Sequence, residues 1–137
     1  MMTKPITRSF QDPIIWTHAL FLINVYLYGD KGYYALSIML MINVIASYYY
    51  HLSSEKDEVC GDLDRISCRL SLMVIIWNLL AHCTWLQVFL SLLWLIISLV
   101  VLDLGERKDY TIFHSIWHFM VFGGNIIVWS YLPILYR

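Results

Sequence analysis

The residues from Leu70 to Leu102 read LSLMVIIWNLLAHCTWLQVFLSLLWLIISLVVL and contain no Asp, Glu, Lys or Arg. An uncharged run of this length is typical of a membrane-spanning helix. As a single helix, it would extend about 50 Å, whereas the hydrocarbon core of a bilayer is about 30 Å thick. The run must therefore hold two spans, and we expect the break near His82-Cys83-Thr84.

The composition supports a membrane protein. Of the 137 residues, 60% are hydrophobic and 14% are charged, against about 25% charged in soluble domains. The net charge of −1 and the absence of a Lys/Arg run give no indication of nucleic-acid binding. We expect a single all-α domain, residues 1–137, folded as a polytopic bundle of about five transmembrane helices. The expected spans are Pro13–Gly29, Gly32–Ser54, about Leu63 to the break, about Trp85–Asp103, and Tyr110–Leu132.

Five spans place three histidines and one aspartate on the same side of the membrane. His51 ends the second span, Asp64 opens the third, and His114 and His118 lie in the opening turns of the fifth. Basic residues are concentrated on this side, and positive charge stays in the cytoplasm. We therefore expect a cytosolic N-terminus, a C-terminus on the opposite face, and a site near the cytosolic side. The basic residues on the expected cytosolic side are Lys4, Arg8, Lys56, Arg65, Arg69, Arg107 and Lys108, against Lys31 and Arg137 on the other.

The histidine spacing indicates a metal site. His114 and His118 are four residues apart, which puts both imidazoles on one face of a helix. With His51 they form a three-histidine set, the ligand number typical of catalytic zinc. Such a metal lowers the pKa of its water to about 7 and polarises a carbonyl group. Asp64 is the expected general base, with Asp62 as its competitor.

Other polar residues have simpler interpretations. Ser47 lies one turn before His51, where its hydroxyl can hold Asp64 or donate to an oxyanion. A lone membrane histidine is more often a hydrogen-bonded helix contact than a ligand. We interpret His18 and His82 in that way. The pair Gly123-Gly124 is expected to allow close helix approach.

Three motifs carry a resemblance to a known superfamily. They are Ser47-Tyr-Tyr-Tyr-His51, then Leu63-Asp64-Arg-Ile-Ser, then His114-Ser-Ile-Trp-His118, followed by two glycines ending at Gly124. The pattern SxxxH, a following Asp, and HxxxH in the last helix resembles that of a group of membrane hydrolases. The group comprises alkaline ceramidases, adiponectin/progestin-type receptors, hemolysin III proteins, GPI-remodelling proteins and myomaker-type proteins.

The resemblance implies a function and a set of site residues. It implies Zn²⁺ ligands at His51, His114 and His118, with Ser47 and Asp64 assisting catalysis. Members of this superfamily normally have seven helices, so this chain resembles a shortened member that lacks two between its third and last spans. The lipid cavity is then smaller, or a second copy of the chain completes it.

Three functions remain open from the sequence. The first is zinc-dependent hydrolysis of a lipid amide or ester, such as ceramide or a glycerophospholipid, by metal-activated water. The second is a non-catalytic structural or receptor-like membrane protein in which zinc only ties helices together. The third is a metal or proton transporter, since His/Asp chains also form relays. It ranks last because it needs polar groups that continue to the far face.

Overall fold

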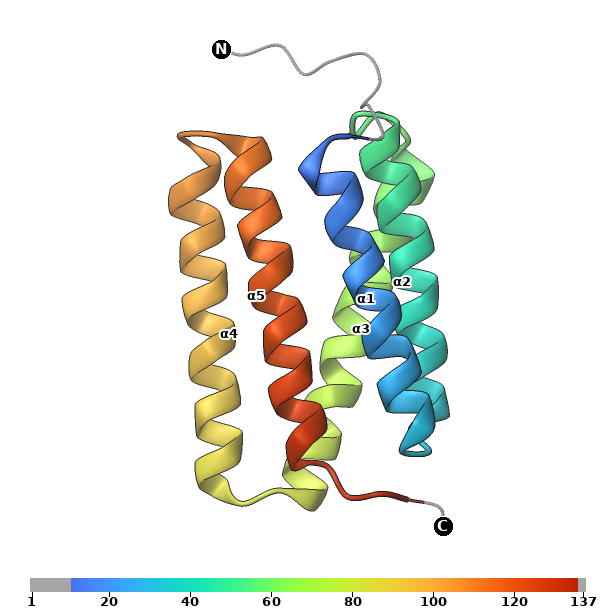
Figure 1. The fold of residues 1–137 in the computed structure, drawn as a ribbon, viewed down its shortest axis with the longest axis vertical. Helices are drawn as coiled ribbons and strands as arrows, with labels where there is room; N and C mark the ends of the chain where they lie inside the picture. Colours follow the sequence, from blue (N-terminus) through green and yellow to red (C-terminus); the bar gives the residue numbers. More distant parts are fainter. Residues whose placement is uncertain (1–10, 136–137) are drawn as a thin grey trace.

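The computed structural model describes residues 11–135, which form five α-helices and no strand (Figure 1). The expected all-α fold is confirmed. Lys4, Arg8 and Arg137, used above to orient the chain, lie outside the described residues. The helices are α1 (Pro13–Asp30), α2 (Tyr34–Leu52), α3 (Glu58–His82), α4 (Trp85–Glu106) and α5 (Tyr110–Tyr131).

The long uncharged run divides where the bilayer thickness requires. Helix α3 ends at His82 and α4 begins at Trp85. Thr84 caps the start of α4, because its hydroxyl accepts the N–H of Gln87 while the Gln87 side chain accepts the N–H of Thr84. This reciprocal capping satisfies two backbone donors that a helix start otherwise leaves open.

Aspartates fix the starts of three other helices. Asp12, Asp57 and Asp109 each accept a backbone N–H in the first turn of α1, α3 and α5. The Asp57 cap starts α3 at Glu58, so the expected start near Leu63 is wrong by more than a turn. The N–H of Cys60 donates to the Asp57 carboxylate at 3.0 Å and lowers the pKa of that group.

The helices lie side by side in one bundle (Figure 1). Helix α2 packs between α1 and α3, and α5 packs between α1 and α4, whereas α3 and α4 touch only slightly. Because the chain alternates direction, the starts of α1, α3 and α5 meet the end of α2 at one end of the bundle. The expected meeting of His51 with the opening turns of α5 follows from this topology.

Three of the described helices are long and apolar enough to cross a membrane. They are α2, α4 over Trp85–Gly105, and α5. Helix α4 also turns large apolar side chains outward, a pattern that suits lipid better than water. Examples are Leu86 at 66%, Phe89 at 60% and Ile96 at 57% exposed.

Lys31 links the turn after α1 to the end of α5, at the opposite end of the bundle from the start of α1. Its ammonium donates to the carbonyl oxygens of Trp129 and Leu132, both at 2.6 Å, and lies 4.3 Å from the centre of the Trp129 ring. Burial against α5 lowers the pKa of this lysine. The turn after α1 is thereby fixed to the end of α5.

The adjacent glycines of α5 give a matched test of helix packing. A Cβ atom on Gly124 would lie 2.7 Å from Cδ1 of Trp94, whereas one on Gly123 would meet nothing within 4 Å. The Trp94 indole is held by a hydrogen bond to the carbonyl of Met120 at 2.8 Å and has little freedom to move.

We expect Gly124→Ala to destabilise the protein by about 1–3 kcal/mol, the usual cost of overpacking. Gly123→Ala should leave stability unchanged or raise it slightly, since alanine favours the helix. Thermal unfolding of the two variants in detergent checks this. Equal melting temperatures would show that α4 and α5 do not meet as closely as described.

Candidate metal centre

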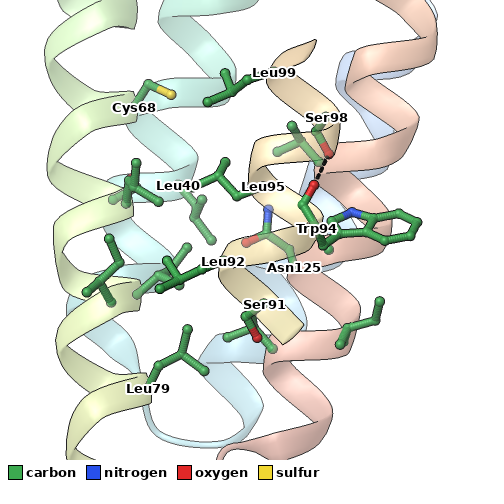
Figure 2. A pocket seen from close by; sticks show the side chains of 18 of the residues that line it. Leu40, Cys68, Leu79, Ser91, Leu92, Trp94, Leu95, Ser98, Leu99 and Asn125 are labelled. Atoms are coloured by element: carbon green, nitrogen blue, oxygen red, sulfur yellow. Dashed lines mark hydrogen bonds between the residues drawn. The ribbon is translucent and has the colours of Figure 1, made fainter. Parts of the chain in front are cut away.

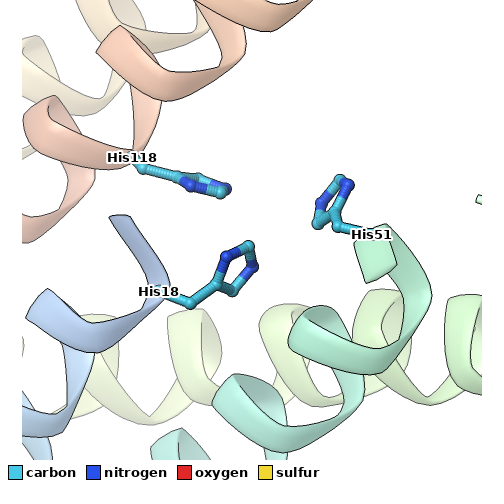
Figure 3. A group of neighbouring side chains, drawn as sticks. All are labelled: His18, His51 and His118. Carbon is cyan, nitrogen blue, oxygen red and sulfur yellow. The ribbon is translucent and has the colours of Figure 1, made fainter. Parts of the chain in front are cut away.

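Three buried histidines from three helices meet near one end of the bundle (Figure 3). His18 comes from α1, His51 from α2 and His118 from α5, and each is at most 3% exposed. One ligating nitrogen from each lies within 4.8 Å of the others. We call these three residues the histidine cluster. Nitrogens on a tetrahedral zinc ion lie about 3.4 Å apart, so small side-chain rotations let the cluster hold a metal ion.

Hydrogen bonds on α1 orient two of the three imidazoles. The carbonyl oxygen of Ile14 lies 2.6 Å from Nδ1 of His18 and 2.9 Å from the hydroxyl of Thr17. A carbonyl only accepts, so we assign the His18 proton to Nδ1. The Thr17 hydroxyl donates its one proton to Ile14, so it accepts from Nδ1 of His118, 2.6 Å away. Both histidines then keep the lone pair of Nε2, as a metal ligand requires.

The third imidazole has a carboxylate partner. Nδ1 of His51 lies 3.2 Å from Oε1 of Glu55, and both side chains are 3% exposed. A carboxylate accepts, so the His51 proton is assigned to Nδ1 and the lone pair to Nε2.

His114 lies against the cluster. Its ring centre is 4.8 Å from that of His51 and 4.8 Å from that of His118. The prediction that His114 ligates the metal stays a prediction, because the tightest group of ligand atoms contains His18 in its place. His18, interpreted from the sequence as a hydrogen-bonded helix contact, does form hydrogen bonds with Ile14 and Ser47, and it also belongs to the group of ligand atoms that could hold an ion.

Ser47 and Asp64 reach this region from two helices. Ser47 is buried, and its hydroxyl donates to Nε2 of His18 at 2.8 Å. It also forms a side-chain hydrogen bond with the Asp64 carboxyl group, which lies near His51. The amide of Asn43 donates to Asp64 at 3.0 Å. The chain Asn43–Asp64–Ser47–His18 thus links α3 to the cluster.

Asp62, the competitor for the acid role, faces outward. Its carboxylate is 67% exposed and pairs with Arg65 at 2.6 Å. This is an ordinary exposed ion pair within one helix. The predicted catalytic role of Asp64 stays a prediction, but of the two aspartates it is the one placed beside Ser47.

An apolar cavity of about 190 Å³ lies between α3 and the pair α4 and α5 (Figure 2). Its walls include Phe21 and Trp117, whose rings lie 5.8 Å and 5.5 Å from the ring of His118. Asn43, the partner of Asp64, also lines it. The cavity therefore runs up to both the histidine cluster and Asp64. Leucine is the most frequent residue among those labelled in Figure 2, which include Leu40, Leu79, Leu92, Leu95 and Leu99.

Two buried donors interrupt this apolar lining. The hydroxyl of Ser71 and the indole N–H of Trp117 have no hydrogen-bond partner among the described residues, and both residues line the cavity. A buried donor left open costs about 1–3 kcal/mol. The cavity thus has two points at which a mostly apolar ligand can place a carbonyl or hydroxyl group.

No family model matches the chain, and neither a curated protein nor a solved structure is similar enough to count as a match. The resemblance to membrane hydrolases therefore rests on the three short motifs, and the chemistry must be argued from the site itself.

Proposed function

We propose that the chain is an integral-membrane zinc protein that hydrolyses a lipid amide or ester, of the ceramide or glycerophospholipid class. The observation that carries this proposal is a buried three-histidine cluster next to an apolar cavity. A metal site beside an apolar cavity suits a reaction at the polar end of a lipid.

We further propose that all five helices cross the membrane, with the N-terminus in the cytosol. Helices α1 and α3 lie alongside the three candidate spans (Figure 1). Their 18 and 25 residues correspond to about 27 Å and 37 Å, enough to cross most or all of a bilayer core. The histidine cluster then lies near the cytosolic face.

The residues suit zinc. Imidazole nitrogen is a preferred zinc ligand, and three protein ligands are typical of a catalytic ion. His51 and His118 belong to both candidate sets, and we propose His18 as the third ligand with His114 beside it. For His18 to bind metal, Ser47 must release Nε2 and turn to Asp64, with which it already interacts. The bound ion would polarise the substrate carbonyl and acidify a water molecule.

The chain's own residues complete the chemistry. Asp64 accepts a proton from the attacking water and returns it to the leaving nitrogen or oxygen as the acyl bond breaks. Ser47 orients Asp64 or donates to the developing oxyanion. The cavity excludes water and holds the acyl chain. The products are a fatty acid and the corresponding amine or alcohol.

The experiment is a hydrolysis assay on the purified protein with separate ceramides and glycerophospholipids. We expect fatty acid release that stops on chelation and returns on addition of zinc. No release from any lipid by protein that carries zinc would refute the hydrolase proposal while leaving the metal site intact.

The placement of the cluster also favours a second function, a structural zinc site. The three histidines come from α1, α2 and α5, so one ion would tie three helices together. Binding stabilises the folded form by about 2.7 kcal/mol at a hundredfold excess over Kd. Chelation that lowers the melting temperature of protein unable to hydrolyse any lipid would support this function.

A further inference from the structure

The turn after α2 bends back on the histidine cluster. Ser54 and Glu55 adopt left-handed backbone angles, with φ of 56° and 64°. The N–H of Ser54 donates to the carbonyl of His51 at 3.0 Å, and that of Glu55 donates to the carbonyl of Tyr50 at 2.9 Å. Left-handed geometry costs about 1–2 kcal/mol per non-glycine residue. Two such residues in succession indicate that surrounding contacts hold this turn in a strained conformation, which is typical of functional sites.

The turn places the buried Glu55 carboxylate next to His51. Glu55 is 3% exposed at its side chain, and its Oε1 lies 3.2 Å from Nδ1 of His51. The phenol of Tyr110, at the start of α5, donates to the same oxygen. Burial of a carboxylate is costly without such partners. The same Tyr110 ring lies 4.9 Å from the ring of His114.

We infer that Glu55 is a positioning residue of the metal centre, and this inference rests on the metal site of the proposed function. Its carboxylate accepts Nδ1–H of His51, which fixes the ring orientation and directs the Nε2 lone pair inward. Metal-binding histidines almost always have such an outer partner. Among the cluster histidines, His18 and His118 use a carbonyl and a hydroxyl. Glu55 would add a negative charge beside the three neutral ligands when they hold a zinc ion.

Tyr110, at the start of α5, supports the same arrangement through its hydrogen bond to Glu55. It holds the Glu55 carboxylate in place and links the turn after α2 to α5. His51 and His118 are therefore kept in register by a contact outside the cluster itself. No motif in the sequence marks Glu55, because the turn that directs its side chain is not visible from residue spacing.

The test is the zinc affinity of the whole protein in detergent, measured by competition with a chromophoric chelator. We expect Glu55→Ala to weaken zinc binding about 10- to 100-fold, the usual effect of losing an outer partner. Glu55→Gln keeps an acceptor without the charge and should fall between Glu55→Ala and wild type. Tyr110→Phe removes one hydrogen bond and should weaken binding about fivefold. Glu58→Gln, an exposed glutamate three residues along the chain, should leave affinity unchanged.

A double-mutant cycle separates positioning from general folding. In a Glu55→Ala background, Tyr110→Phe should cause no further loss of zinc affinity, because the carboxylate that the phenol holds is gone. Equal affinity of wild type and Glu55→Ala, or an undiminished loss from Tyr110→Phe in the Glu55→Ala background, would overturn the inference alone. Wild-type protein that binds no zinc would overturn both the inference and the metal site beneath it. If Glu55→Ala fails to fold, the zinc affinities of Glu55→Gln and Tyr110→Phe test the inference in its place.

Discussion

Replacement of His118 by alanine is expected to reduce the zinc content of the purified protein from about one ion per chain to background, because a three-ligand site rarely survives on two. His118 belongs to both candidate ligand sets and is the least exposed member of the cluster. It is 2% exposed, its ring lies 4.5 Å from that of His18 and 5.9 Å from that of His51, and Thr17 fixes its orientation. Elemental analysis of protein purified without added chelator makes the measurement.

The matched control is His82→Ala. His82 ends α3 at the opposite end of the bundle from the cluster and is exposed. Its variant should bind zinc as wild type does. Zinc retained by His118→Ala at the wild-type level, in correctly folded protein, would show that the cluster is only a packing arrangement.

Replacement of Asp64 by asparagine is expected to slow fatty acid release by a factor of about 10²–10⁴, the range for loss of a general base. Asparagine has nearly the same shape and can still accept from Asn43, which donates to Asp64 at 3.0 Å. It cannot take a proton from water. Because Asp64 is not one of the cluster residues, zinc content should remain at about one ion per chain. The measurement is the initial rate of lipid hydrolysis, with zinc content determined on the same sample.

Asp62→Asn is the control for this second variant. Asp62 is two residues away and pairs with Arg65 at the surface. Its loss should leave the rate within about twofold of wild type, as expected for an exposed pair. If Asp64→Asn hydrolyses lipid at the wild-type rate, Asp64 is not the general base, and another group must take the proton from water.

The helices were predictable because their limits follow from local chemistry. The run from Leu70 to Leu102 is too long for one span, and Thr84 carries the side chain that caps the second helix. The start of α3 was missed because its early turns carry charged residues. There the cap at Asp57 decides the boundary and hydropathy does not.

The candidate site was predictable only in part. His51, His114 and His118 stand out because they occur in spaced motifs or end a helix. His18 stands alone in its helix, so the sequence offers no partner for it. Its position near the start of α1, at the same end of the bundle as His118, is the available signal. The contact itself depends on α1 packing between α2 and α5, and residue spacing does not encode which helices are neighbours.

The most direct test of the central claim is the X-ray absorption spectrum, at the zinc edge, of the purified wild-type protein. The account predicts bound zinc with three imidazole nitrogens at about 2.0–2.1 Å and no sulfur at about 2.3 Å. The spectrum of His18→Ala should then show one imidazole fewer. Protein that carries no zinc, or zinc held by cysteine sulfur, would contradict a metal centre built from His18, His51 and His118.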